Sequence, residues 1–287
     1  MEGFAPKNIL CPVDLSAASP LVLRWADLFA QKYGAKLEVL LAESPEYPAY
    51  FLPGQEDELA RQAENRRAAL QKHLEKTVFE TVGSATSSEI RVVEGHPVQA
   101  ILRRMETNPP DLIVMGSHGR SGVARMRLGS VAETVVREAR MPTLVVRALG
   151  RRPAPTAVSR VLCPAKLTDH GHQCVDFSAS IAAKFGAQLV VVHSAEHETA
   201  NLEAVRKELC RLISADARQT CEVVEVVRKG SAAEQILLAA REHSVDLIVI
   251  AAQHQPFLEF TTLGTTAERI MRHADSAVLI LPGGMGE

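Results

Sequence analysis

The sequence predicts an α/β protein made of two successive, doubly wound parallel sheets, because three observations agree. The chain has 287 residues, which is room for about two domains of ordinary size. One half of the sequence repeats the other. Within each half, short β-rich runs alternate with helical patterns, which is typical of a parallel sheet with helices on both faces.

The internal repeat is visible in two pairs of matched segments. Residues 9–16 (ILCPVDLS) match residues 161–168 (VLCPAKLT) at an offset of 152. Residues 110–115 (PDLIVM) match residues 245–250 (VDLIVI) at an offset of 135. Two copies are too few for a solenoid, so the repeat indicates a duplicated domain.

The change of offset from 152 to 135 means that the first repeat carries 17 more residues than the second. This excess lies between Leu37 and Gly95, and the Pro- and Tyr-rich segment 43–54 is the candidate for an extra loop. A Gly-, Arg- and Pro-rich stretch separates the repeats and reads as a linker. The expected boundaries are a first domain over 1–147, a linker over 148–157 and a second domain over 158–287.

Strands and helices alternate through the first repeat. Ser19 is expected to cap the first helix, with Pro20 in its first turn and Gly34 at its end. Residues 112–115 form a continuous apolar run, as in strands buried on both faces. The other expected strands are 9–13, 37–41, 90–93 and 143–147, and the later helices are 56–82, 97–105 and 130–139.

Composition excludes several classes of protein. The chain is 46% hydrophobic and 23% charged, which argues against disorder. Its net charge of −2 makes non-specific nucleic-acid binding unexpected, and no apolar run approaches the roughly 18 residues of a membrane span. Five cysteines without a C-x-x-C pair are typical of reduced thiols, which predicts a cytoplasmic protein.

A glycine-rich loop follows the fourth expected strand. Residues 116–130 read GSHGRSGVARMRLGS, a G-x2-G-x9-G-S pattern. Glycines let the backbone approach a phosphate, and Gly129-Ser130 lies at a helix start, where free N–H groups favour an anion. Positive charge would come from Arg120, Arg125 and Arg127. The alternative is an ordinary turn in which Ser130 caps the helix and Glu133 completes a capping box.

The second repeat favours the phosphate interpretation. Gly116 and Gly119 become Ala251 and His254, and all three arginines are lost. The helix start is retained as Gly264-Thr265, with Glu268 in the place of Glu133. The glycines and arginines are therefore not required by the fold.

Asp14 shows the same contrast between the repeats. It ends the first strand, where a carboxylate can accept a hydrogen bond from a ribose hydroxyl or an adenine amine, and its counterpart is Lys166. The alternative is a carboxylate that caps the helix or lies on the surface. Together, the loop and Asp14 predict one nucleotide site in the first repeat and a degenerate one in the second.

These motifs resemble the universal stress protein family in its tandem form. The resemblance is carried by residues 9–16, 93–97, 111–119 and 129–130, and it covers nearly the whole chain, twice over. It implies Rossmann-like, adenine-nucleotide-binding domains that pack as a pseudo-dimer. The last strands, 143–147 and 277–281, would pair within the chain, and a homodimer of whole chains stays open.

The resemblance also implies which residues hold the ligand, expected to be ATP with or without Mg²⁺. Ala42 would line the base pocket, where the family usually has Val. The other implied residues are Val13, Asp14, Met115, Gly116, Gly119, Gly129, Ser130 and Val131. From the loop itself we add Arg120 and His118, and His118 would lie close to the last phosphate. There it would orient a water molecule, bind the phosphate or pack within the loop.

The predicted function is therefore a cytoplasmic, nucleotide-dependent regulator of a stress response. Two alternatives stay open: a slow ATPase or autophosphorylating enzyme using His118 or Ser130, and a nucleotide-free scaffold. No catalytic residue and no metal site is assigned. The second repeat gathers histidines after its strands, interpreted as solvated side chains rather than metal ligands: His170, His172, His193, His197 and His254, with Asp169.

Overall fold

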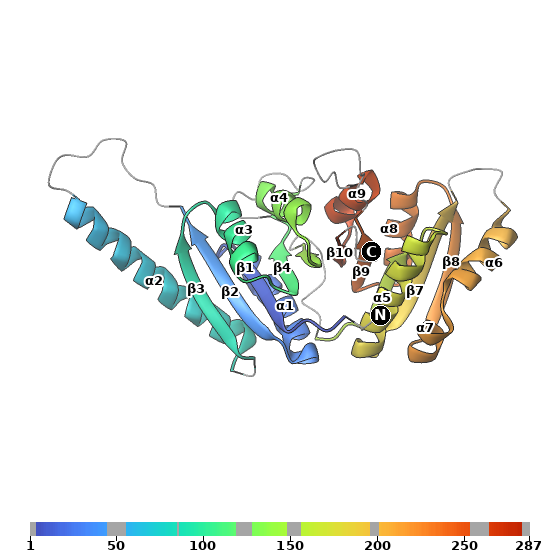
Figure 1. Ribbon diagram of the computed structural model, residues 1–287, viewed down its shortest axis with the longest axis horizontal. Helices are drawn as coiled ribbons and strands as arrows, with labels where there is room; N and C mark the ends of the chain where they lie inside the picture. Colours follow the sequence, from blue (N-terminus) through green and yellow to red (C-terminus); the bar gives the residue numbers. More distant parts are fainter. Residues whose placement is uncertain are drawn as a thin grey trace.

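The computed structural model describes residues 4–44, 56–84, 86–118, 128–147, 156–195, 201–252 and 264–282. Its strands form one sheet in the order β3-β2-β1-β4-β5-β10-β9-β6-β7-β8 (Figure 1). The first half contributes β1 (Asn8–Val13), β2 (Lys36–Glu43), β3 (Ser88–Glu94), β4 (Leu112–Gly116) and β5 (Thr143–Val146). The second contributes β6 (Arg160–Pro164), β7 (Gln188–Ala195), β8 (Val223–Lys229), β9 (Leu247–Ala251) and β10 (Ala277–Leu281).

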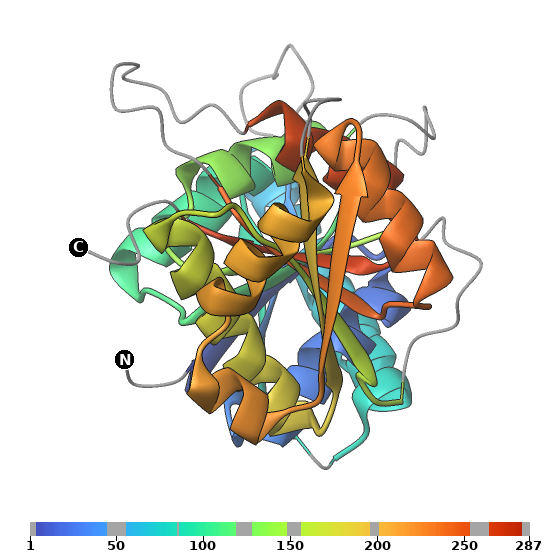
Figure 2. The same cartoon turned by 90° about the vertical axis from the view of Figure 1, so that its right-hand side faces the viewer.

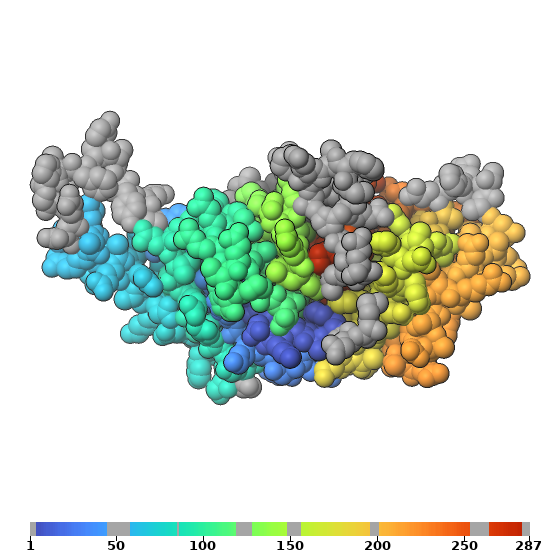
Figure 3. Space-filling view, in the orientation of Figure 1, coloured from blue at the N-terminus to red at the C-terminus, as the bar shows by residue number. Residues whose placement is uncertain are grey.

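The two halves are joined through their last strands. All strand pairs within a half are parallel. Strands β5 and β10 pair antiparallel, with Val145 opposite Val278 and Thr143 opposite Ile280. The predicted α/β fold, with two five-stranded parallel sheets packed as a pseudo-dimer, is therefore confirmed. The halves lie side by side in one elongated body (Figure 3).

Helices cover both faces of the sheet (Figure 2). One buried cluster lies under α1 (Ser19–Tyr33), α2 (Glu56–Val82), α5 (Asp169–Phe185), α6 (Leu202–Leu212) and α7 (Ala215–Thr220). The other lies under α3 (Pro97–Thr107), α4 (Ser130–Glu138), α8 (Ala232–Glu242) and α9 (Thr265–His273). No helix among the described residues is long and apolar enough to cross a membrane.

The start of α1 differs from the expectation. Ala18 precedes the helix, and Ser19 is its first residue rather than its cap. The Ser19 hydroxyl instead donates to Asp14, 3.2 Å away, so a contact with the preceding strand end takes the place of helix capping. Gly34 ends α1 in the left-handed conformation (φ 68°), as predicted.

The capping box expected at the start of α4 is absent. Gly129 is the N-cap, and no side-chain hydrogen bond caps the helix within the described residues. Glu133 instead pairs with Arg137, one turn further along, at 2.8 Å. In the second half, Gly264 is the N-cap of α9 and Glu268 pairs with Arg272. The two glutamates thus stabilise their helices through i,i+4 ion pairs.

The 17-residue excess of the first half is not one extra loop. Helix α2 has 27 residues, whereas the second half has two short helices there, α6 with 11 and α7 with 6. Part of the excess is therefore helical. Among the side chains of α2 that the structure describes, the buried ones all lie in its C-terminal half: Leu74, Val78 and Val82. Of the candidate loop, residues 45–54 lie outside the described residues.

Candidate functional site

The strand order places a topological switch point between β1 and β4. From β1 the sheet continues to β2 and β3 on one side and to β4 and β5 on the other. In such sheets ligands bind beyond the carboxyl ends of the strands at this point. The ends of β1, β2 and β4, together with the start of α4, carry most of the residues named from the sequence.

Asp14 shapes the turn between β1 and α1. Its Oδ1 accepts hydrogen bonds from the backbone N–H of Ser16 at 3.0 Å and from the Ser19 hydroxyl at 3.2 Å. Ser19 is only 2% exposed, so its hydroxyl holds the carboxylate from within the protein. Leu15, between them, has a positive φ of 58°, a conformation that costs a non-glycine residue about 1–2 kcal/mol.

The matching turn of the second half is built differently. Lys166 replaces Asp14, and Gly171 replaces Ser19. A Cβ atom on Gly171 would lie 1.8 Å from the carbonyl oxygen of Lys166, so this turn closes directly onto the helix. Leu167, unlike its counterpart Leu15, is not among the described residues with positive φ. Only the first half thus has, among the described residues, a turn with a positive φ at Leu15 and hydrogen bonds to the Asp14 carboxylate.

The end of β4 is connected to the start of α4 by backbone hydrogen bonds. The N–H of Gly129 donates to the carbonyl of Ser117 at 2.8 Å, and the N–H of Ser117 donates to Val146 at 2.8 Å. Gly116 is closely packed, because a Cβ atom there would lie 3.3 Å from the His118 carbonyl and 3.4 Å from the Val22 side chain. These contacts place Gly116 beside the first turn of α4, whose amide groups have no side-chain cap among the described residues.

His118, which follows the end of β4, has one bonded and one unbonded ring nitrogen among the described residues. Its Nδ1 is hydrogen-bonded to the Ser117 hydroxyl at 2.9 Å. Its Nε2 is buried and has no hydrogen-bond partner in the described parts of the chain. A buried polar atom without a partner is costly, so Nε2 is suited to contact a ligand. Gly119 and Arg120, and with them Arg125 and Arg127, lie outside the described residues.

The remaining predicted residues divide into two groups. Val13 is the last residue of β1 and Ala42 the last but one of β2; both are half-buried, and they lie on adjacent strands, because Val13 is in register with Leu41. Ser130 is exposed on the first turn of α4, and Val131 is half-buried behind it. Met115, by contrast, is only 3% exposed and packs in the core between the sheet and α4.

Sequence reasoning missed two residues of this site as contributors, Ser19 and Leu15. The residue type and position of Ser19 predict only a helix cap, although its counterpart Gly171 differs from it as sharply as Lys166 differs from Asp14. Comparison of the repeats at every position would have found Ser19. The positive φ of Leu15 has no signal in its residue type, because the same residue occurs at 167.

Two histidines of the second half, His172 and His193, bind backbone carbonyls, and His170 is exposed. His172 Nδ1 lies 2.7 Å from the Leu212 oxygen, and His193 Nδ1 lies 2.8 Å from the Ala165 oxygen. No group of three or more metal-ligating side chains occurs in the described part of the chain. His197 and His254 lie outside it.

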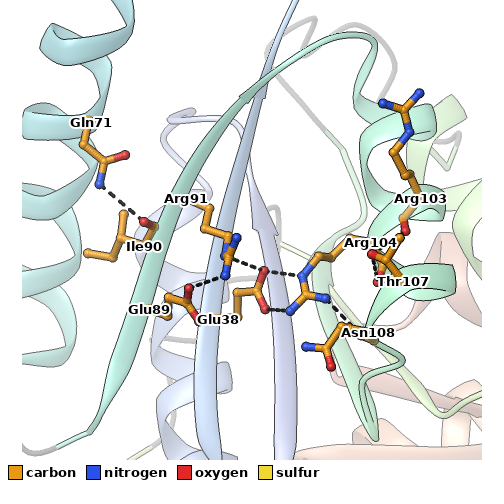
Figure 4. A network of polar contacts seen from close by, with 9 residues as sticks. All are labelled: Glu38, Gln71, Glu89, Ile90, Arg91, Arg103, Arg104, Thr107 and Asn108. Carbon is orange, nitrogen blue, oxygen red and sulfur yellow. Dashed lines mark hydrogen bonds and ion pairs between the residues drawn. The ribbon is translucent and has the colours of Figure 1, made fainter.

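A polar network distinguishes the first half away from the strand ends (Figure 4). Glu38 on β2 accepts from Arg104 Nε on α3 at 2.6 Å and lies 3.5 Å from Arg91 Nε on β3. The Glu38 and Arg104 side chains are 13% and 16% exposed, and their hydrogen bond raises the pKa of Arg104 above its ordinary value. The counterparts of Glu38, Arg91 and Arg104 are Val190, Val226 and Ala239. This network therefore attaches α3 to the sheet and is not part of the candidate site.

Comparison with known proteins agrees with the fold and with the repeat. The family model described as the universal stress protein family matches the chain twice, over residues 6–147 and 157–282. A universal stress protein of Methanocaldococcus jannaschii is 33% identical over 144 residues, which are 49% of this chain and 82% of that protein. One from Thermus aquaticus is 32% identical over 142 residues, 49% of this chain and 98% of that protein.

A solved universal stress protein from Archaeoglobus fulgidus has the same tandem extent. It covers 96% of this chain and 98% of its own, with a TM-score of 0.69 and 22% sequence identity. The fold and the repeat thus define a tandem α/β protein whose two halves pair edge to edge. The chain belongs to the universal stress protein family.

Proposed function

We propose that the first half, with a domain boundary near residue 147, binds one adenine nucleotide, ATP with or without Mg²⁺. The observation that carries the proposal is the asymmetry between two halves of one fold. In the first half, the Asp14 carboxylate accepts hydrogen bonds within the turn after β1, and Leu15 in that turn has a positive φ. The first half also has a closely packed glycine, Gly116, at the end of β4. The second half has Lys166 and Ala251 at these places.

The groups at this edge suit a nucleotide by their chemistry. Val13 and Ala42 offer half-buried apolar contact to a base, and Asp14 offers acceptor oxygens to ribose or adenine. The start of α4, from Gly129 to Val131, offers backbone N–H groups to phosphates. Met115 and Gly116 form the end of β4 at the proposed site, and Gly119 and Arg120 belong to the proposed phosphate loop that follows. The nucleotide would control the conformation or partner of a cytoplasmic stress-response regulator.

Nucleotide bound to the purified protein tests this proposal. Denaturing the protein and analysing the released small molecules by mass spectrometry should identify an adenine nucleotide, and calorimetry on the stripped protein should measure ATP binding. Gly116→Ala/Gly119→Ala should lose most of both signals. Gly264→Ala is the matched control, because a Cβ atom there meets nothing within 4 Å. No nucleotide and no binding by the wild type, or unchanged binding by the double glycine variant, would overturn it.

The buried Nε2 of His118 favours a second candidate function, slow ATP hydrolysis. A general base must lie within hydrogen-bond reach of the water that it activates. Single-turnover hydrolysis by the wild type and by His118→Ala distinguishes the two functions. A rate that falls at least tenfold in the variant, with ATP affinity retained, would support hydrolysis. Equal background rates would leave nucleotide binding alone, and radioactive phosphate retained on the chain would indicate autophosphorylation.

A further inference from the structure

Two cysteine thiols contact each other inside the second half. The Sγ atoms of Cys163 on β6 and Cys174 on α5 lie 3.5 Å apart. Their side chains are buried, with exposed fractions of 0% and 4%. The two residues are 11 positions apart in the sequence and belong to different elements. A bond between them would therefore connect a strand to the helix that covers it.

The first half lacks this pair although it has the same fold. Cys11 is the counterpart of Cys163, but Val22 is the counterpart of Cys174. Cys11 is buried, and burial raises the pKa of its thiol. Because an aliphatic side chain fills the same position in the first half, the fold does not require a thiol at 174. The thiol pair is an addition to the second half.

The pair lies just beneath the edge of the sheet that corresponds to the proposed nucleotide site. In the first half, the Val22 side chain is 3.4 Å from the place where Gly116 would carry a Cβ atom. In the second half, the same positions are Cys174 and Ala251, the last residue of β9. Ala251 is half-buried, and its backbone is hydrogen-bonded to Cys174, so the thiol pair adjoins a residue at the end of its strand that is partly exposed.

The two sulfurs differ in character. The hydrogen bond from Cys163 lowers the pKa of Cys174, and the Ala251 backbone and Ser178 act in the same direction, against the effect of burial. The same hydrogen bond, together with burial, raises the pKa of Cys163. Cys174 is also the more accessible of the two, at 4% exposed against 0% for Cys163, so peroxide reaches Cys174 first and Cys163 lies within contact distance to react next.

We propose that hydrogen peroxide oxidises Cys163 and Cys174 to a reversible disulfide. The second half of the chain is then the half that oxidation modifies. The Cys174 sulfur attacks one oxygen of the peroxide and breaks the O–O bond. The released hydroxide takes up the thiol proton as water and leaves a sulfenic acid. The Cys163 sulfur then displaces the hydroxyl group, and its proton leaves in a second water molecule. Two thiols are oxidised and one peroxide is reduced to two waters.

The test uses the full chain with Cys210→Ser and Cys221→Ser, which leaves Cys11, Cys163 and Cys174. The reduced protein is treated with hydrogen peroxide, quenched, denatured and alkylated. We expect the number of alkylated thiols to fall from three to one, with the loss of two hydrogens in the intact mass. Trypsin cuts after Lys166 and so separates the two cysteines, which should appear as one cross-linked peptide pair. Dithiothreitol should restore all three thiols.

Cys174→Val is the matched control, because it copies Val22 of the first half. Its two remaining thiols should stay reduced under the same treatment, and Cys174→Ala serves if the larger side chain disturbs folding, as judged by circular dichroism and thermal melting. The proposal is wrong if Cys163 and Cys174 both stay alkylatable under peroxide that fully oxidises the exposed Cys210 of the wild type. Separate oxidation of each thiol to a sulfinic acid would also contradict it.

Discussion

The ammonium group of Lys32 lies 5.8 Å from the centre of the Phe185 ring, across the junction between the two halves. The reciprocal contact is also present, because Lys184 Nζ lies 5.5 Å from the centre of the Tyr33 ring. Lys184 and Phe185 are the counterparts of Lys32 and Tyr33 at the offset of 152. The C-terminal ends of α1 and α5 thus meet around a pseudo-twofold axis, on the side of the sheet where Phe29 also packs against Phe185.

Tyr33 makes this junction asymmetric in a testable way. Its hydroxyl is buried without a hydrogen-bond partner among the described residues, and burial raises its pKa above the ordinary value. Tyr33→Phe removes the unpaired hydroxyl and copies Phe185. We expect the free energy of unfolding to rise by about 1 kcal/mol. Thermal melting measures the change, and Phe185→Tyr should shift the melting temperature in the opposite direction. A lower melting temperature for Tyr33→Phe would show that the hydroxyl is satisfied.

The close packing of the turn after β6 predicts that alanine destabilises the protein much more at Gly171 than at Gly264. Gly171→Ala places a Cβ atom 1.8 Å from a backbone carbonyl, so we expect destabilisation of more than about 3 kcal/mol. Gly264→Ala meets nothing within 4 Å and should cost about 1 kcal/mol at most, through its N-cap position. Chemical denaturation of both variants checks this order. Equal free energies of unfolding for the two variants would contradict the close approach of Gly171 to Lys166.

The network around Glu38 predicts that replacing both Glu38 and Arg104 destabilises the protein less than replacing Glu38 alone. Glu38→Val leaves Arg104 half-buried without its carboxylate, and we expect a loss of about 2–3 kcal/mol. Glu38→Val/Arg104→Ala copies the second half, which has Val190 and Ala239 there, and should recover part of that loss. Urea denaturation of both variants measures the difference. A double variant less stable than Glu38→Val would mean that Arg104 contributes mainly through packing.

The contact between Ser19 and Asp14 predicts how they affect nucleotide affinity, given the proposed function. If Ser19 holds the Asp14 carboxylate, Ser19→Ala should weaken ATP binding about fivefold, the effect of one hydrogen bond of about 1 kcal/mol. In the Asp14→Asn background it should have a much smaller effect, because the residues act together. Calorimetry on the four proteins gives this cycle. Full additivity would assign independent roles to Ser19 and Asp14.

The fold could be predicted from the sequence because its signals are local and occur twice. Local signals predict single elements, as the apolar run at 112–115 does for a strand and Gly34 does for the end of a helix. The repeat then predicts the same order of elements in the second half. The α2 helix was predicted with the bounds that it has, Glu56–Val82. Its length accounts for part of the 17-residue excess, which the sequence pattern alone assigns to a loop.

The site was only partly predictable, because tertiary contacts override local preferences there. Ser19 has the residue type of an N-cap, but its hydroxyl binds Asp14, the residue that follows the preceding strand. Ser130 and Glu133 have capping-box spacing, yet Gly129 takes the cap and Glu133 pairs with Arg137. Met115 is buried by the packing of α4 on the sheet, and its place around the ligand stays a prediction. Roles in binding for Val13, Asp14, Ala42 and the α4 start stay predictions.

The number of ATP molecules bound per chain tests the central claim, that two halves of one fold differ in function, most directly. Calorimetric titration of nucleotide-free protein with ATP and Mg²⁺ should give one site per chain. That site should be lost in Gly116→Ala/Gly119→Ala and kept in Gly264→Ala. Two equivalent sites per chain, or one site that survives the double glycine substitution, would contradict the account.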